Sequence, residues 1–148
     1  MRIMGIDYGE RRMGMAISDP LGITAQGLPT MERTHPDEDI KKIVQLIREN
    51  DVSEVVVGLP KHMNNSLGEK AQAVLAFIEI LKKFVNVPIY TLDERLSTVR
   101  AERALLEGNL SRKKRKVRVD MVAAQLILQD YLARRQIKPP ESSLAQGD

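Results

Sequence analysis

The sequence predicts an α/β domain with a mixed five-stranded sheet and helices on both faces. Three short apolar runs follow one another near the amino terminus, which is typical of an antiparallel meander. After them, apolar runs alternate with segments of helical periodicity, as in strand–helix–strand units with parallel strands. The 148 residues, of which 43% are hydrophobic, are enough for one complete core. We expect this domain to span residues 1–136, and the polar residues 137–148 to form a disordered tail.

The first three strands are expected at residues 2–8, 12–18 and 22–31. A tight turn at Gly9 and Glu10 joins the first two into a hairpin. The run "EVVVGLP", residues 54–60, is rich in β-branched side chains and ends at glycine and proline, which indicates a strand buried on both faces. The fifth strand is expected at residues 87–92.

Four helices complete the predicted order. Residues 37–50 carry isoleucine and valine at helical spacing, with acids early and Arg48 late, as the helix dipole prefers. The remaining helices are expected at residues 67–84, from Ser97 or Thr98 to Gly108, and at residues 120–135. The first two of the four are expected to connect successive strands, and the last two follow the final strand.

The composition excludes several kinds of site. The chain has no cysteine, which rules out disulfides and thiolate metal sites, and His35 and His62 are far apart in the sequence. A bound metal ion would therefore be held mainly by oxygen atoms, which favours Mg²⁺ or Mn²⁺. No apolar stretch has the length of a membrane span, and the amino terminus lacks the pattern of a signal peptide. We therefore expect a cytoplasmic protein that does not bind membranes.

Positive charge is concentrated in one short segment. The formal net charge is only +3, but "SRKKRKVR", residues 111–118, carries six positive side chains in eight positions and no acid. This segment directly precedes the last predicted helix. Its composition suits either a solvated loop or a surface that binds nucleic acid.

Three acids are expected to meet at one end of the sheet. Asp7 ends the first strand, and Glu94 follows the fifth. Asp120 begins the last helix on the same stripe as the apolar residues that face the sheet. Clustered carboxylates repel one another unless cations neutralise them, and two Mg²⁺ ions about 4 Å apart would align a water against a phosphodiester. The three positions are therefore candidate catalytic and metal-binding residues of a nuclease.

Each acid also has a simpler interpretation. Asp7 suits a turn at the end of a strand, where aspartate is common. Glu94 and Asp120 suit the beginning of a helix, because acids there favour the positive end of the helix dipole. Spacing alone predicts a metal-dependent nuclease without excluding these structural roles.

Four segments of the chain resemble the motifs of a known family. They are "IMGIDYGERRMGMAISD", "VVVGLPKHMNNSLGEKAQ", "TLDERLSTVRAE" and "KKRKVRVDMVAAQLILQDYL". Together they are similar to the YqgF family of bacterial proteins, which are named as pre-16S rRNA nucleases and Holliday-junction-resolvase-like proteins. The resemblance covers about residues 2–135.

This resemblance implies a ribonuclease H-like fold and a magnesium-dependent phosphodiester hydrolase that acts in ribosomal RNA maturation. Asp7, Glu94 and Asp120 correspond to the proposed catalytic carboxylates of the family. Related resolvases often carry a fourth acid one turn from the third, but Val117 and Ala123 occupy those positions here. The missing acid bears on whether both metal ions bind without substrate.

Several polar residues near these acids are expected to contact nucleic acid. Basic side chains neutralise backbone phosphates whatever the sequence. The carboxyl end of a central strand, where "GLPKHMNNS" lies, is a usual position for ligands in α/β sheets. The candidates are Arg11, Arg12, Lys61, Asn64, Asn65, Arg112, Lys113, Lys114, Arg115, Lys116 and Arg118.

The sequence also limits the partners and the alternatives. Aromatic residues are few, which favours structured or double-stranded nucleic acid over a threaded single strand. The expected substrate is pre-ribosomal RNA or branched DNA, with ribosomal particles as a further partner, and the protein is expected to be a monomer or a homodimer. A sugar-kinase-like or actin-like ATPase would need a second domain and a second glycine-rich phosphate loop. A nucleic-acid-binding assembly factor that does not cleave is the more serious alternative, besides a Holliday-junction resolvase.

Overall fold

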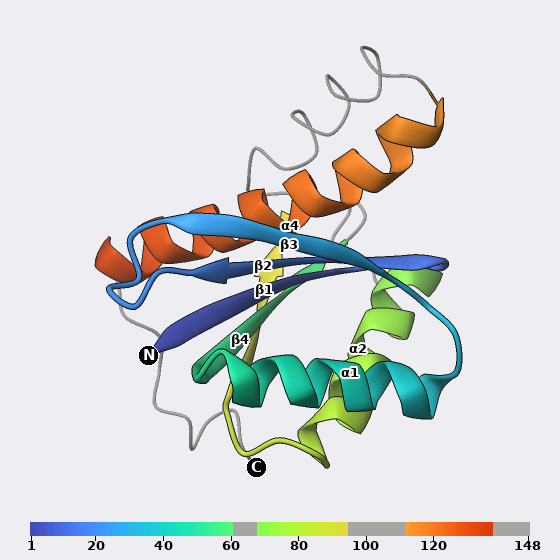
Figure 1. Ribbon diagram of the computed structural model, residues 1–148, viewed down its shortest axis with the longest axis horizontal. Helices are drawn as coiled ribbons and strands as arrows, with labels where there is room; N and C mark the ends of the chain where they lie inside the picture. The colour runs from blue at the N-terminus through green and yellow to red at the C-terminus, as the bar shows by residue number, and fades with distance from the viewer. Residues whose placement is uncertain (61–67, 95–111, 138–148) are drawn as a thin grey trace.

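Five strands and three helices make up the part of the chain that the structure describes. In this computed structural model these are residues 1–60, 68–94 and 112–137, with the side chains of 119–135 in the last range. The strands are β1 (Arg2–Tyr8), β2 (Arg12–Ser18), β3 (Ala25–Glu32), β4 (Val52–Leu59) and β5 (Ile89–Asp93). The helices are α1 (Pro36–Glu49), α2 (Glu69–Lys82) and α4 (Arg112–Ile137). Figure 1 shows α1 and α2 on one face of the sheet and α4 on the other.

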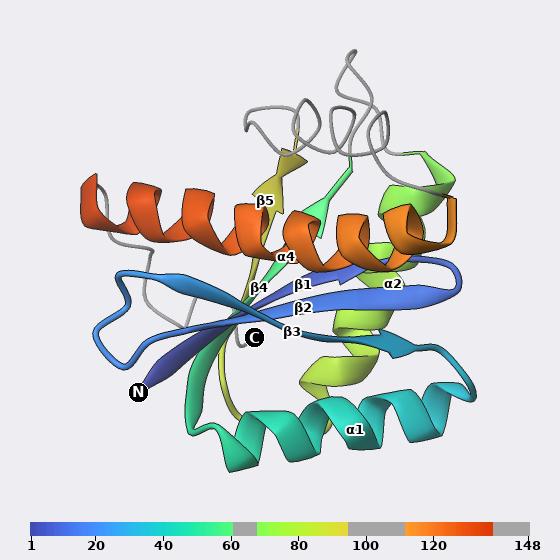
Figure 2. The same ribbon diagram turned by 45° about the horizontal axis from the view of Figure 1, so that its top comes forward.

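The strand order across the sheet is β3-β2-β1-β4-β5. β2 runs antiparallel to both of its neighbours, whereas β4 runs parallel to β1 and to β5. The mixed sheet with an antiparallel part followed by parallel strands is therefore confirmed. Because β1, β4 and β5 are parallel, their carboxyl ends lie at the same end of the sheet; in Figure 2 β4 and β5 end toward the top and β1 ends toward the right.

Two hydrophobic layers cover the two faces of the sheet. The larger layer lies between the sheet and α1 and α2, and includes Met4, Ile6 and Ile43. The smaller layer lies under α4, where Ile127 and Leu128 pack with no exposed surface. β4 contributes to both layers, as its continuous β-branched run predicts.

The prediction that the last helix begins at Asp120 is wrong, because α4 begins at Arg112. The basic residues 112–118 are thus the first two turns of this helix and not a loop ahead of it. Lysine and arginine are good helix formers, and neither glycine nor proline interrupts residues 112–137. The apolar periodicity that marks a helix in the sequence starts only at Val119, where buried positions begin. Figure 1 shows the first turns of α4, in orange, rising away from the sheet.

Some expected elements fall outside the described residues. These are the helix expected from Ser97 or Thr98 to Gly108 and, apart from Ile137, the tail expected at residues 137–148. Within the described ranges, no helix combines the length and the apolar character that a membrane span would need.

A buried polar cluster fixes the carboxyl-terminal half of α4 to the sheet. The Tyr131 hydroxyl donates a short hydrogen bond to the carboxylate of Glu54 on β4, and Arg135 Nη2 lies 2.9 Å from the other carboxylate oxygen. The ring of Tyr131 also stacks on Tyr90 of β5, with 6.0 Å between ring centroids. Burial raises the pKa of the Tyr131 hydroxyl above its ordinary value of 10.0, and the hydrogen bond to Glu54 raises it further.

This shift predicts a loss of stability in alkaline solution. Above about pH 10 the unfolded chain releases the Tyr131 proton while the folded chain keeps it, so the free energy of unfolding falls as pH rises. One such group contributes a slope of up to about 1.4 kcal/mol per pH unit. Urea unfolding of the native protein and of Tyr131→Phe, which keeps the ring, measures the difference. Parallel pH profiles for the two proteins would contradict the expectation.

Candidate active site

Glycines inside the strands let α4 lie unusually close to the sheet. An ideal Cβ on Gly14 of β2 would lie 1.8 Å from the carbonyl oxygen of Asp120. A Cβ on Gly5 of β1 would lie 2.9 Å from Leu128 Cβ and 3.0 Å from the Ala124 carbonyl oxygen. Side chains at these two strand positions would therefore push the helix off the sheet.

Asp7 lies on the face of the sheet that α4 covers. It is two residues beyond Gly5, and side chains two apart along a strand point to the same face. Its partner across the hairpin is Gly14, the residue against which the backbone of Asp120 packs. The hairpin register and the close approach of α4 thus bring Asp7 and Asp120, both half-buried, to the same end of the same face.

Glu94 reaches this face from the far side of β4. It directly follows β5 and is only 6% exposed. Its Oε2 lies 3.1 Å from the position that a Cβ of Gly58 would occupy on β4, the strand between β1 and β5. The carboxylate of Glu94 therefore extends over β4 toward β1. A larger residue at Gly58 would occupy this space and also contact Ile127 of α4.

The three predicted acids thus share one end of the α4-covered face. The structure does not hold them at the spacing of a ready-made metal site, since within the described ranges no group of three or more His, Asp or Glu side chains is placed to hold a metal ion. Asp7, Glu94 and Asp120 each already take part in a polar or electrostatic interaction. Their donor set consists of carboxylate oxygens, which fits a hard cation such as Mg²⁺ or Mn²⁺.

Only two of the residues predicted to contact nucleic acid, Arg11 and Arg12, have side chains in the described part of the chain. Arg11, in the turn after β1, is exposed. Arg12 is partly buried, with its side chain 24% exposed, and its Nε lies 3.6 Å from Oε1 of Glu32 on β3. Residues outside the described part of the chain are Lys61, Asn64 and Asn65, and the side chains of Arg112, Lys113, Lys114, Arg115, Lys116 and Arg118 are likewise not described.

Two features of this region were missed from the sequence. One is the role of Gly14, against which the backbone of Asp120 packs, although a glycine inside a strand is itself a signal that another chain segment approaches closely. The other is Arg33, which follows β3 and donates from Nη1 to the carbonyl oxygen of Gly9 at 2.9 Å. No motif marks Arg33, because its partners are backbone groups more than twenty positions away in the sequence.

Comparison with known proteins identifies close relatives across nearly the whole chain. A relative from Clostridium acetobutylicum, named "Putative pre-16S rRNA nuclease", is 54% identical over 132 residues, which cover 89% of this chain and 98% of the relative. Relatives with the same name from Halothermothrix orenii and Moorella thermoacetica are 54% and 52% identical. They cover 89% and 90% of this chain, and the matches span 94% and 96% of those relatives.

Solved structures that share the fold include Holliday junction resolvases. Thermus thermophilus RuvC in complex with a Holliday junction has a TM-score of 0.58 at 16% identity, over 93% of this chain and 97% of that chain. The fowlpox virus resolvase has a TM-score of 0.54 at 13% identity, over 90% of this chain and 99% of that chain. These likenesses confirm the ribonuclease H-like fold. The family model of RuvX, described as Holliday junction resolvase, matches residues 1–134. With this match and relatives about half identical in sequence, the chain belongs to the RuvX family, which the motif resemblance names YqgF.

Proposed function

We propose that this protein is a metal-dependent nuclease that hydrolyses phosphodiester bonds in structured nucleic acid, with pre-16S ribosomal RNA as its substrate. The observation that carries the proposal is the placement of Asp7, Glu94 and Asp120 at one end of the α4-covered face. Relatives about half identical to this chain are named for this activity and this RNA. Such a substrate would place the protein in the cytoplasm, in contact with immature ribosomal particles.

Asp7, Glu94 and Asp120 are proposed to hold Mg²⁺ or Mn²⁺ when nucleic acid is bound. When bound, such ions supply a polarised water and neutralise the charge that develops on the phosphate. Since the three carboxylates are not grouped at ligand spacing, cation and substrate would draw them together. Glu94 suits this role because its carboxylate, which is only 6% exposed, extends over Gly58 of β4 toward the end of β1.

The chain's own positive groups would hold the substrate backbone. Arg11 is exposed in the turn that follows Asp7, where it could pair with a phosphate near the carboxylates. The first turn of α4 contains no acidic residue and begins with basic ones, which opposes the helix dipole. A phosphate at this end of α4 would be favoured by the helix dipole and would offset the positive charge of these residues. Such binding would weaken steeply as salt concentration rises.

Two other functions have specific support. A Holliday-junction resolvase is favoured by the description of the family model and by the shared fold. A ribosome assembly factor that binds RNA without cleaving it would keep the RNA for which the relatives are named, but not the reaction. Both would share the fold with the proposed nuclease. The resolvase differs from it in substrate, and the assembly factor differs from it in lacking the reaction.

One experiment separates these three functions. Purified protein is incubated with pre-16S rRNA and, separately, with a four-way DNA junction, each in Mg²⁺, Mn²⁺ or a chelator. We expect cleavage of the RNA in either metal and none in the chelator. Cleavage of the junction alone would support the resolvase and contradict the RNA substrate. Binding of RNA without cleavage in any condition would support the assembly factor, and equal cleavage in chelator would rule out the metal.

A further inference from the structure

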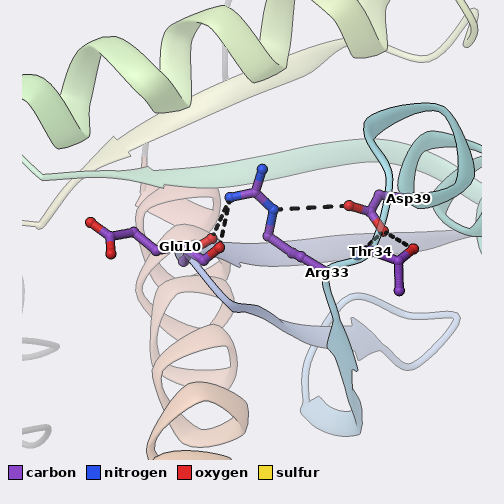
Figure 3. A network of polar contacts seen from close by, with 5 residues as sticks. Glu10, Arg33, Thr34 and Asp39 are labelled. Carbon is purple, nitrogen blue, oxygen red and sulfur yellow. Dashed lines mark hydrogen bonds and ion pairs between the residues drawn. The ribbon is translucent and has the colours of Figure 1, made fainter.

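Arg33 bridges the β1–β2 turn from the face of the sheet opposite α4. Its Nη1 donates to two successive carbonyl oxygens of the turn, that of Gly9 at 2.9 Å and that of Glu10 at 3.1 Å (Figure 3). These are the second and third residues after Asp7 in the chain. One guanidinium group therefore fixes the backbone that leaves the end of β1.

A buried carboxylate holds Arg33 in this position. Asp39, near the start of α1, is only 3% exposed, and its Oδ2 lies 3.9 Å from Arg33 Nε. Its Oδ1 accepts hydrogen bonds from the backbone N–H of Thr34 at 3.0 Å and from the Thr34 hydroxyl at 3.3 Å. Figure 3 shows Arg33 between Asp39 on one side and the turn at Glu10 on the other. Asp39 of α1 thus orients the guanidinium group of Arg33, and the guanidinium group in turn holds the β1–β2 turn through its hydrogen bonds.

Arg33 also lies over the ring of Tyr8, the residue that follows Asp7. Its Cζ lies 4.5 Å from the centroid of the Tyr8 ring, and that ring stacks on Phe77 of α2 at 4.5 Å and 28°. Tyr8 belongs to the layer under α1 and α2, whereas Asp7 points to the α4 face. A guanidinium and an aromatic ring that enclose Tyr8 on one face therefore restrict the backbone from which the Asp7 carboxylate extends on the other.

We propose that Arg33 is a positioning residue for Asp7, acting through the sheet and not by touching substrate. The inference rests on the proposed nuclease function for its kinetic consequences. The donors described for Arg33 are occupied by Asp39 and two backbone carbonyl oxygens, so they already serve the protein. The backbone N–H of Arg33 donates to the carbonyl oxygen of Arg11 at 2.8 Å, a bond that a side-chain substitution preserves. The hairpin therefore stays paired with the end of β3 when the guanidinium is removed.

Cleavage kinetics of three variants test this role: Arg33→Met, Arg33→Lys and Arg48→Met. Arg48 is exposed in the last turn of α1, so Arg48→Met controls for the loss of one positive charge. We expect Arg33→Met to lower kcat by about 10- to 100-fold and to raise the Mg²⁺ concentration for half-maximal rate, as losses of groups that orient metal ligands do. KM for RNA should stay near the native value. Arg33→Lys should retain more activity than Arg33→Met, because an ammonium can reach one carbonyl oxygen but lacks the planar fork.

The opposite pattern would overturn the proposal. A higher KM with unchanged kcat and metal dependence would make Arg33 a phosphate contact, and losses equal to those of Arg48→Met would make it a general charge effect. A lower melting temperature with native kcat per folded molecule would make it merely structural. If the native protein cleaves neither substrate, the proposed function fails, and the ¹³C carboxyl resonance of Asp7 decides the inference by itself. That resonance should move in Arg33→Met and not in Arg48→Met, and an unmoved resonance would overturn the coupling.

Discussion

Replacing Asp7 by asparagine is expected to lower the rate of nucleic-acid cleavage by about 10³-fold while binding persists. The substitution keeps the size of the side chain but removes the negative charge that attracts a divalent cation. A metal ion contributes several kcal/mol of transition-state stabilisation, and each 1.4 kcal/mol corresponds to about a factor of ten in rate. Single-turnover cleavage in Mg²⁺ measures the loss. Binding measured in chelator should stay the same or tighten, because one negative charge has left the neighbourhood of the phosphates.

A nearby acid provides the matched control. Glu10 lies three residues further along the chain, in the exposed part of the β1–β2 turn, and Glu10→Gln also removes one negative charge. Only the backbone carbonyl of Glu10 contacts Arg33, so its side chain can change without disturbing that bond. We expect Glu10→Gln to cleave at nearly the native rate. Equal losses in the two variants would mean that net charge, and not the position of Asp7, determines the rate.

Replacing Gly14 by alanine is expected to destabilise the fold by at least about 3 kcal/mol, at the upper end of the range for overpacked cores. The new Cβ would lie 1.8 Å from the Asp120 carbonyl oxygen and 2.5 Å from its carbonyl carbon. Both are backbone atoms within α4, so no side-chain rotation relieves the contact. The helix must shift, and the Asp120 carboxylate shifts away from Asp7 with it. Urea unfolding measures the stability, and cleavage by the folded fraction measures the displacement.

Gly27 on β3 offers a control with the same chemical change. A Cβ there would lie 2.5 Å from Met121 Sδ and 2.6 Å from Met121 Cγ, both atoms of a flexible side chain that can rotate away. Gly27→Ala should therefore cost about 1 kcal/mol or less and keep the cleavage rate near native. If Gly14→Ala and Gly27→Ala are equally stable, the close approach of α4 at Asp120 is not a rigid feature of the fold.

Hydrophobic periodicity was sufficient to predict the strands and two of the helices. β1 and β2 have the predicted bounds, and β4 is buried on both faces as its β-branched run indicates. Periodicity was insufficient for α4, since the two turns at residues 112–118 carry charged residues instead of an apolar stripe. A helix that extends past the sheet has no apolar face to show there.

The candidate site likewise has a part that could be predicted from the sequence and a part that could not. Acid positions at strand ends and on a buried stripe could be recognised from spacing, and the motif resemblance assigned a role to Asp7, Glu94 and Asp120. Arg33 could not be recognised, because hydrogen bonds to backbone carbonyl oxygens leave no pattern of residue types in the sequence. The extension of Glu94 over Gly58 depends on strand order, which places β4 between β1 and β5.

The sequence by itself determined the class of fold and the order of its strands along the chain, and with the motif resemblance it predicted Asp7, Glu94 and Asp120 as candidate nuclease acids. Those features follow from local periodicity and from residue chemistry, which act over a few positions. Only the tertiary structure decided how close α4 lies at Gly14, how far Glu94 reaches over β4, and which residue braces the turn after Asp7. These are contacts between segments that are distant in the chain. They depend on how closely the segments pack, to within tenths of an ångström, and the spacing of residues along the sequence does not encode this.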